Sequence, residues 1–160
     1  MGTKLQHIEY NNKLLNKMKN TPHSAQLFLR LALGIGFILP VMDRFGWLGT
    51  PGSPTVSWGN WSVFLDYTNT LMPFLARPVA NIMAIVATAS ELVFAILLIA
   101  GYKIKWAAIG SFLLTLAFAL SMFFFANYRA PFNYSVFVVS AASLLLATLP
   151  AYKWSIEARK

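Results

Sequence analysis

The chain is divided into long apolar runs separated by short polar segments. Four runs are long enough to cross a membrane, at about residues 24–42, 78–100, 106–125 and 132–149. Each has roughly 18–23 residues, and about 20 helical residues are needed to cross a hydrocarbon core ~30 Å thick. The pattern predicts an all-α membrane protein, an antiparallel bundle of four transmembrane helices. The membrane domain then covers residues 24–150, between a basic cytoplasmic tail at 1–23 and a second cytoplasmic tail at 151–160.

The connection between the first two runs, residues 43–77, is long and rich in glycine, proline and tryptophan. In its second half, from Trp61 to Leu75, apolar residues recur at helical spacing among polar ones. Such a segment is too polar to span a membrane. We therefore expect a helix that lies in the outer interface and is anchored there by tryptophans.

The positions of the basic residues predict the orientation. With the N-terminus inside, the inner segments hold nine lysines and arginines: Lys4, Lys13, Lys17, Lys19, Lys103, Lys105, Lys153, Arg159 and Lys160. The outer segments hold three: Arg44, Arg77 and Arg129. This asymmetry follows the positive-inside rule, and it predicts that both termini lie in the cytoplasm.

Composition excludes several classes of function. Hydrophobic residues make up 58% of the chain and charged residues 11%, against about 25% charged in soluble domains. The net charge is +8, but the basic residues lie at the ends of apolar runs, and this distribution argues against nucleic-acid binding. There is no cysteine, so thiol redox chemistry, iron–sulfur clusters and zinc–thiolate sites are excluded. Both histidines, His7 and His23, precede the first run, which excludes a histidine-ligated haem within the membrane. No metal site is expected.

Small residues predict how two of the helices pack. In the third run Ala107, Ser111, Thr115 and Ala119 recur every four residues. The fourth run is also rich in serine and alanine between Ser135 and Ala147. Because small residues let helix backbones approach closely in lipid, these two helices are expected to form a compact contact.

Three stretches resemble a known family. They are Arg30-Leu-Ala-Leu-Gly-Ile-Gly36 leading to Asp43-Arg-Phe-Gly46, then Glu91 through Gly101, and then a basic turn followed by Ala107-Ala-Ile-Gly110. From Gln26 to Pro150 the chain is similar to the DoxX-like family of four-helix bacterial membrane proteins. The resemblance implies a multi-pass protein of the bacterial inner (cell) membrane. It also implies a link to quinone-dependent redox systems, because family members are associated with thiosulfate:quinone oxidoreductase.

Two charged residues fall within the apolar runs. Arg30 lies about six residues, or ~9 Å, from the inner end of its run, and Glu91 about nine residues, or ~14 Å. A lone charge at such depth costs roughly 2.5–3.5 kcal/mol on insertion scales, so we expect the two side chains to pair. The pair either fixes helix packing or lines a polar pocket for a quinone headgroup, an anion or a proton. Alternatively, Arg30 snorkels to the interface without a partner.

A second group of charges is predicted at the outer interface: Asp43, Arg44, Asp66, Arg77 and Arg129, with Asn127 and Asn133 nearby. It is either ordinary solvated loop charge or an entrance beneath the tryptophan-rich segment. The candidate ligand-binding residues are therefore Arg30, Glu91, Asp43, Arg44 and Asn133.

Three functions fit the sequence. The first is an accessory, quinone-binding subunit of a redox system, with a partner protein that carries the redox centre. The second is a small transporter for an anion or a proton. The third is an assembly or scaffold subunit without a ligand. No catalytic residue is identified, because no nucleophile–base pair is visible. A homo-oligomer is compatible with all three functions.

Overall fold

The computed structural model describes residues 23–159, and every regular element in them is helical. In chain order the elements are α2 (His23–Arg44), α3 (Trp61–Leu71), α4 (Arg77–Ala100), α5 (Ile104–Ser121), the π-helical turn η1 (Met122–Ala126), α6 (Ala130–Asn133), α7 (Val136–Thr148) and the 3₁₀ turn η2 (Glu157–Arg159). The all-α prediction is confirmed for this part of the chain. The basic tail predicted before the first helix lies almost wholly outside the described residues.

Three helices have the length and composition of membrane spans. They are α2 with 22 residues, α4 with 24, and α5 continued through η1 with 23. At 1.5 Å per residue each is about 33–36 Å long, enough to cross a hydrocarbon core ~30 Å thick. Their outward faces carry exposed Leu, Ile, Val and Phe side chains that would be unfavourable in water. The chain is therefore an integral membrane protein.

The fourth predicted span, residues 132–149, is interrupted. A short helix, α6, is followed by a turn at Tyr134 and Ser135 before α7 begins. Ser135 has a φ of 55°, in the left-handed region that an α-helix does not tolerate. The remaining helix, α7, has 13 residues and is about 20 Å long, so α7 alone is shorter than the other three helices. Two polar residues, Asn133 and Ser135, interrupt the apolar run at this point and mark the turn that a single continuous helix would not have.

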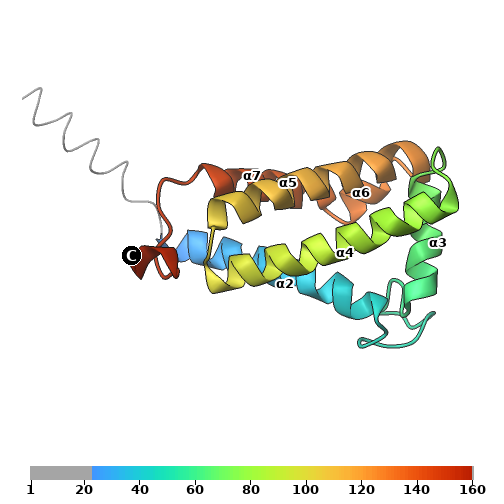
Figure 1. Cartoon of the computed structure of the whole chain (residues 1–160), viewed down its shortest axis with the longest axis horizontal. Coiled ribbons are helices and arrows are strands. Elements are labelled where there is room, and N and C mark those ends of the chain that lie inside the picture. The colour runs from blue at the N-terminus through green and yellow to red at the C-terminus, as the bar shows by residue number, and fades with distance from the viewer. Residues whose placement is uncertain (1–22, 160) are drawn as a thin grey trace, which may run out of the picture.

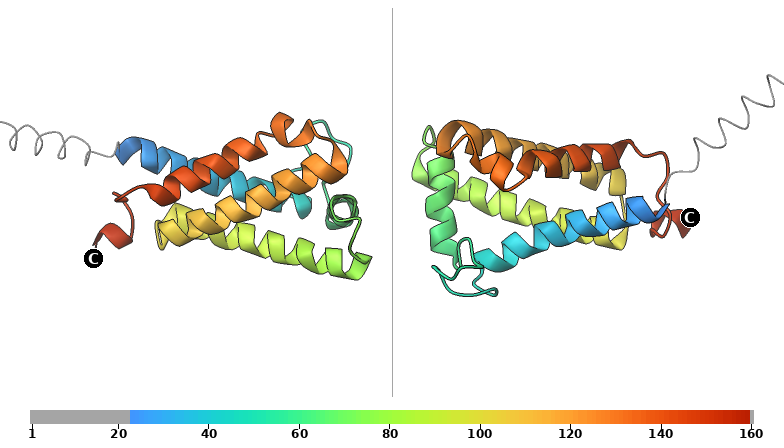
Figure 2. Two further views of the ribbon diagram at one scale, coloured as in Figure 1. Left: turned by 90° about the horizontal axis from the view of Figure 1, so that it is seen from above. Right: turned by 180° about the vertical axis from the view of Figure 1, so that it is seen from behind.

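The long helices run antiparallel along one axis, whereas α3 lies across one end of the bundle, roughly perpendicular to it (Figure 1). Helix α2 packs on α4, and α5 packs on α7. The views from above and from behind show the same arrangement (Figure 2). A helix that crosses the end of the bundle fits the expected interfacial position, although it ends at Leu71 rather than Leu75.

The small-residue ridge of α5 is buried as expected. Ala107, Ser111, Thr115 and Ala119 are each at most 4% exposed. The Ser140 hydroxyl of α7 donates to the Phe112 carbonyl of α5 over 3.2 Å. Such a contact requires close backbones, which small side chains allow.

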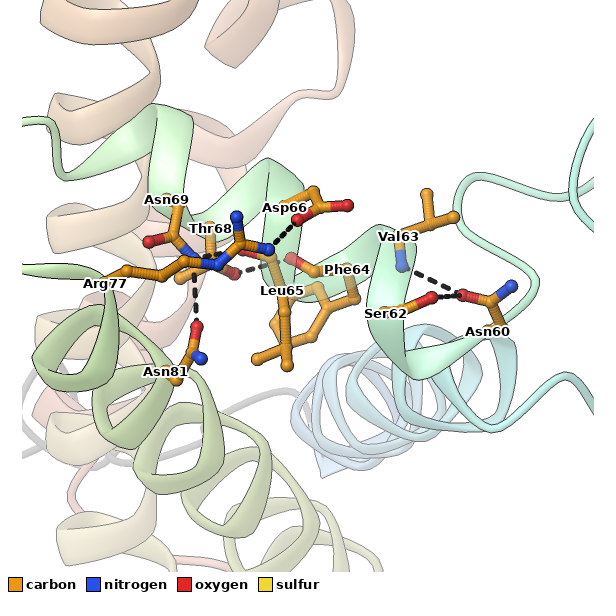
Figure 3. Close-up of polar contacts among 10 residues, drawn as sticks. All are labelled: Asn60, Ser62, Val63, Phe64, Leu65, Asp66, Thr68, Asn69, Arg77 and Asn81. Atoms are coloured by element: carbon orange, nitrogen blue, oxygen red, sulfur yellow. Dashed lines mark hydrogen bonds and ion pairs between the residues drawn. The ribbon is translucent and has the colours of Figure 1, made fainter.

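Helix α3 is fixed at its start and at its far end (Figure 3). The Asn60 side chain caps its first turn, accepting from the Val63 N–H over 2.9 Å. Further along, Asp66 forms an exposed ion pair with Arg77 at the start of α4. The amide of Asn69 donates to that of Asn81 over 2.9 Å. These contacts hold α3 against the first turns of α4.

Candidate functional site

The centre of the candidate site is a buried ion pair between Arg44, the last residue of α2, and Glu91 in the middle of α4. Arg44 donates to both carboxylate oxygens of Glu91, with Nη2 3.0 Å from Oε1. Both residues are at most 3% exposed. The prediction that Glu91 pairs with Arg30 is therefore wrong: the partner is the other arginine of the same helix.

The relative depth of the two helices explains the error. The guanidinium of Arg30 lies beside Gly101, where α4 has already ended. Arg44 follows fourteen residues later, about 21 Å along α2, and therefore reaches the level of Thr88 and Glu91. The first turns of α2 thus project beyond the end of α4. Depths counted from the ends of the two apolar runs are therefore not comparable, because the two helices do not end at the same level.

Aromatic rings and one hydroxyl complete the surroundings of Arg44. Its guanidinium carbon lies 4.0 Å from the ring centre of Phe64 and 5.2 Å from that of Trp58. Its Nη1 donates to the Thr88 hydroxyl over 2.8 Å, and that hydroxyl donates to the Ala84 carbonyl. Cation–π contacts of this kind stabilise a desolvated guanidinium. The Nε atom is buried and has no hydrogen-bond partner among the described residues.

Asp43, next to Arg44, shapes the loop that carries one of these rings. Its carboxylate accepts from the backbone N–H groups of Ser57, Trp58 and Gly59 over 3.0–3.2 Å. Only 5% of Asp43 is exposed. The carboxylate thus holds Trp58 over the guanidinium of Arg44.

The other predicted outer charges do not join this cluster. Asp66 and Arg77 pair with each other on the surface. Arg129 is exposed and contacts Tyr128. Asn133 is exposed at the end of α6 and contributes no side-chain hydrogen bond. Of the five candidate ligand residues, the structure brings together Asp43, Arg44 and Glu91.

Arg30, the fifth candidate, lies apart from the cluster, at the end of the bundle where α2 begins. Its Nη2 donates to the backbone carbonyl of Trp154 over 2.8 Å. The segment after α7 folds back over this end, as the position of the C-terminus beside the start of α2 shows (Figure 1). Part of the cytoplasmic tail predicted at residues 151–160 is thus folded against the bundle, and the sequence does not predict this contact.

An apolar groove of about 300 Å³ meets the cluster at Thr88, whereas Arg44 and Glu91 do not line it. It lies between α2 and α4, and its lining residues are Val41, Phe45, Trp61, Ile85, Thr88, Ala89 and Leu92. The rings of Phe45 and Trp61 stack at 5.9 Å with an interplanar angle of 10°. Thr88 belongs both to the groove and to the cluster. It joins a polar, charged site to a surface that suits a hydrocarbon chain.

Sequence reasoning missed Thr88, Phe64 and Trp58 as members of the site. A threonine three residues before an intramembrane glutamate lies on the same helical face, and that spacing was a usable signal. No comparable sequence pattern points to Phe64 and Trp58, because their rings reach Arg44 only through the folding of the loop.

Comparison with known proteins bears on the first three long helices. No curated protein and no solved structure matches the chain. A family model described as DoxX matches residues 25–126, which is more than half of the 160 residues and includes Arg30, Asp43, Arg44 and Glu91. The chain is therefore a member of the DoxX family of membrane proteins.

Proposed function

We propose that the protein is an accessory membrane subunit of a quinone-linked redox system, similar to thiosulfate:quinone oxidoreductase, and that the quinone binds at the groove beside Arg44, Glu91 and Thr88. The observation that carries this proposal is the position of Thr88, which belongs both to the charged cluster and to the apolar groove. A quinone has a polar ring and an apolar chain, and here a charged cluster meets an apolar groove. Ligand sites typically combine an apolar lining with a few placed polar groups.

The residues present fit such a ligand. Arg44 has a buried Nε–H without a partner, a donor for a carbonyl oxygen of the ring. Glu91 is a buried carboxylate able to take up and release a proton. A bound quinone would accept two electrons and two protons. The electrons would come from a partner protein that carries flavin, metal or thiols, because the chain has no cysteine.

The positions of the lysines imply how the bundle is oriented in the membrane. The turn between α4 and α5, the start of α5 and the segment after α7 lie at the end of the bundle where α2 begins (Figure 1). These segments carry Lys103, Lys105 and Lys153. Under the positive-inside rule this end faces the cytoplasm of a bacterial cell, with both termini inside. The groove and α3 then lie toward the outer half of the membrane.

Tryptophan quenching tests quinone binding. Trp61 lines the groove, so a short-chain ubiquinone analogue added to the purified protein should quench its fluorescence saturably. Thr88→Val keeps the shape of the side chain but removes the hydroxyl that accepts from Arg44 and so holds the guanidinium in place. With Arg44 less well positioned, the Kd should rise about 5–10-fold, which corresponds to the loss of about one hydrogen bond. Thr115→Val is the matched control, since Thr115 is equally buried but lies in α5. Non-saturable quenching, or equal Kd values in both variants, would refute the proposal.

A scaffold role is the second candidate, and one observation favours it. Both carboxylate oxygens of Glu91 are already occupied by Arg44. The cluster then joins α2, α3 and α4 without a ligand. In that case the quinone analogue would not bind, and Thr88→Val would lower only the stability.

A further inference from the structure

Within residues 23–159, Arg30 is a buried cation without a counter-ion. It is 2% exposed, and its Nη2 donates to a neutral group, the Trp154 carbonyl. Its Nε and Nη1 are buried and have no hydrogen-bond partner in the part of the chain that the structure describes. The ion pairs in the described part of the chain involve Arg44 and Arg77, not Arg30. A guanidinium offers five N–H donors in a fork that matches two oxygens of an anion, and most of these donors are unused.

The cover over Arg30 is the segment 152–158. It is held mainly by polar contacts: Gln26 Nε2 donates to the Lys153 carbonyl over 2.8 Å. At its other end, Glu157 Oε1 accepts from the Lys103 N–H over 2.7 Å. Trp154 is 62% exposed and Ile156 is 50% exposed, so these two large side chains add little burial. Tyr152, at the start of the segment, packs against the core and anchors the segment there.

The backbone of this cover is also strained. Trp154 has a φ of 54°, in the left-handed region that residues other than glycine seldom adopt. Such a conformation persists only where the surroundings hold it, and here they hold it through the carbonyl that Arg30 binds. Residues in strained conformations often belong to segments that move.

The charges at this end favour an anion. Lys103, Lys105 and Lys153 are exposed around the segment. Glu157 is the one acidic residue that the structure describes there, and its carboxylate is engaged by a backbone N–H. A cluster of cations of this kind raises the local concentration of anions.

We propose that Arg30 is the centre of an oxyanion-binding site, that the segment 152–158 covers it, and that a phosphate-like anion binds by displacing this segment. The Trp154 carbonyl occupies one of the positions that an anion oxygen would take. Displacement is required because the space is filled: a Cβ on Gly101 would lie 3.0 Å from Arg30 Nη1 and 2.8 Å from the Cα of Ser155. The site is distinct from the groove at Arg44, at the opposite end of α2.

A single cysteine reports the displacement directly. The chain has no cysteine, and Ser155 is 3% exposed, so Ser155→Cys places one shielded thiol within the covering segment. In detergent, inorganic phosphate should increase the rate of labelling by a maleimide about 10-fold, because labelling follows the population of the open form. Potassium chloride at the same ionic strength should not. Ser62→Cys, exposed at the other end of the molecule, is the matched control and should not respond.

Two further arms identify the source of the anion and the role of Arg30. If phosphate has no effect but nanodiscs with phosphatidylglycerol accelerate labelling relative to phosphatidylcholine, the ligand is a lipid headgroup. In Arg30→Gln combined with Ser155→Cys, the basal rate should rise and the response to either anion should disappear. The proposal is overturned if neither anion accelerates labelling when Arg30 is intact, or if the response survives in Arg30→Gln. The first of these outcomes does not depend on the folding of the Arg30 variant.

Discussion

Arg44 and Glu91 form a two-point ion pair between the end of α2 and the middle of α4, and neither residue is more than 3% exposed. The geometry matters because Arg44 also lies against Phe64 of α3 and Trp58 of the preceding loop. One guanidinium therefore connects two long helices, a loop and the helix that crosses the end of the bundle. Breaking a buried pair leaves an uncompensated charge, whereas replacing both partners does not.

We expect single substitutions of this pair to cost more than the double substitution. Glu91→Leu leaves Arg44 without its counter-ion, and Arg44→Met leaves Glu91 without its own. Each should lower the free energy of unfolding by about 3–5 kcal/mol, and the double variant should lose less than either single variant. Unfolding in detergent, followed by helical circular dichroism, measures all three variants.

The exposed pair of Asp66 and Arg77 provides the control for this cycle. Both side chains are more than 60% exposed, so Asp66→Leu and Arg77→Met should each change stability by less than about 1 kcal/mol. Strictly additive losses for Arg44 and Glu91 would show that the two residues do not act as a unit.

A second expectation concerns Asp43. Asp43→Ala removes three charge-assisted hydrogen bonds to the backbone of Ser57, Trp58 and Gly59. We expect faster amide hydrogen exchange at these three positions and a loss of about 2 kcal/mol in stability. Asp66→Ala, which removes an exposed carboxylate, should leave exchange in residues 57–59 unchanged. Unaltered exchange in Asp43→Ala would contradict the role assigned to the carboxylate.

The fold was largely predictable because hydrophobic blocks of membrane length have few alternative structures. The site was only partly predictable. Arg44 and Glu91 were both recognised as candidates, but their pairing depends on how far α2 is shifted along α4, and apolar runs do not record that shift. The turn at Ser135 was predictable in part, because Asn133 and Ser135 interrupt the apolar run there. The contact between Arg30 and Trp154 was not predictable, because the acceptor is a backbone carbonyl, a group that every residue has.

The ridge of α5 leads to a third expectation. Ser111 is fully buried, so Ser111→Leu inserts three additional carbon atoms where α5 and α7 are in close contact. Overpacking of this kind typically costs about 1–3 kcal/mol, and the melting temperature in detergent should fall accordingly. Leu113→Phe, two residues along the same helix but 57% exposed, should have little effect. If both variants melt alike, the ridge does not limit the packing.

Tyr152 gives a fourth expectation, which concerns pH. Its hydroxyl donates to the Leu146 carbonyl over 2.9 Å, and burial, with a smaller contribution from the charge of Glu157, raises the pKa of the phenol. A raised pKa means that the folded state favours the protonated phenol. This stabilisation is fully present below pH ~10 and is lost as the pH rises through the folded-state pKa. Tyr152→Phe should therefore be less stable by about 1 kcal/mol at pH 8, and the difference should shrink above pH 10. A difference that stays constant from pH 8 to 11 would show that the phenol does not titrate with unfolding.

The last expectation compares two glycines with similar backbones and different surroundings. Gly101 and Gly52 have φ values of 73° and 89°, so alanine at either position adopts an unfavourable left-handed conformation that costs about 1–2 kcal/mol. At Gly52 an added Cβ would meet nothing within 4 Å, whereas at Gly101 it would press on the backbone of Ser155. Gly101→Ala should therefore push the segment 152–158 away from Arg30, and Gly52→Ala should not. Combined with Ser155→Cys, Gly101→Ala should raise the basal rate of maleimide labelling at least about 10-fold, a shift of ~1.4 kcal/mol toward the open form. Equal labelling rates in the two alanine variants would mean that backbone strain alone, and not the contact with Ser155, sets the position of the segment.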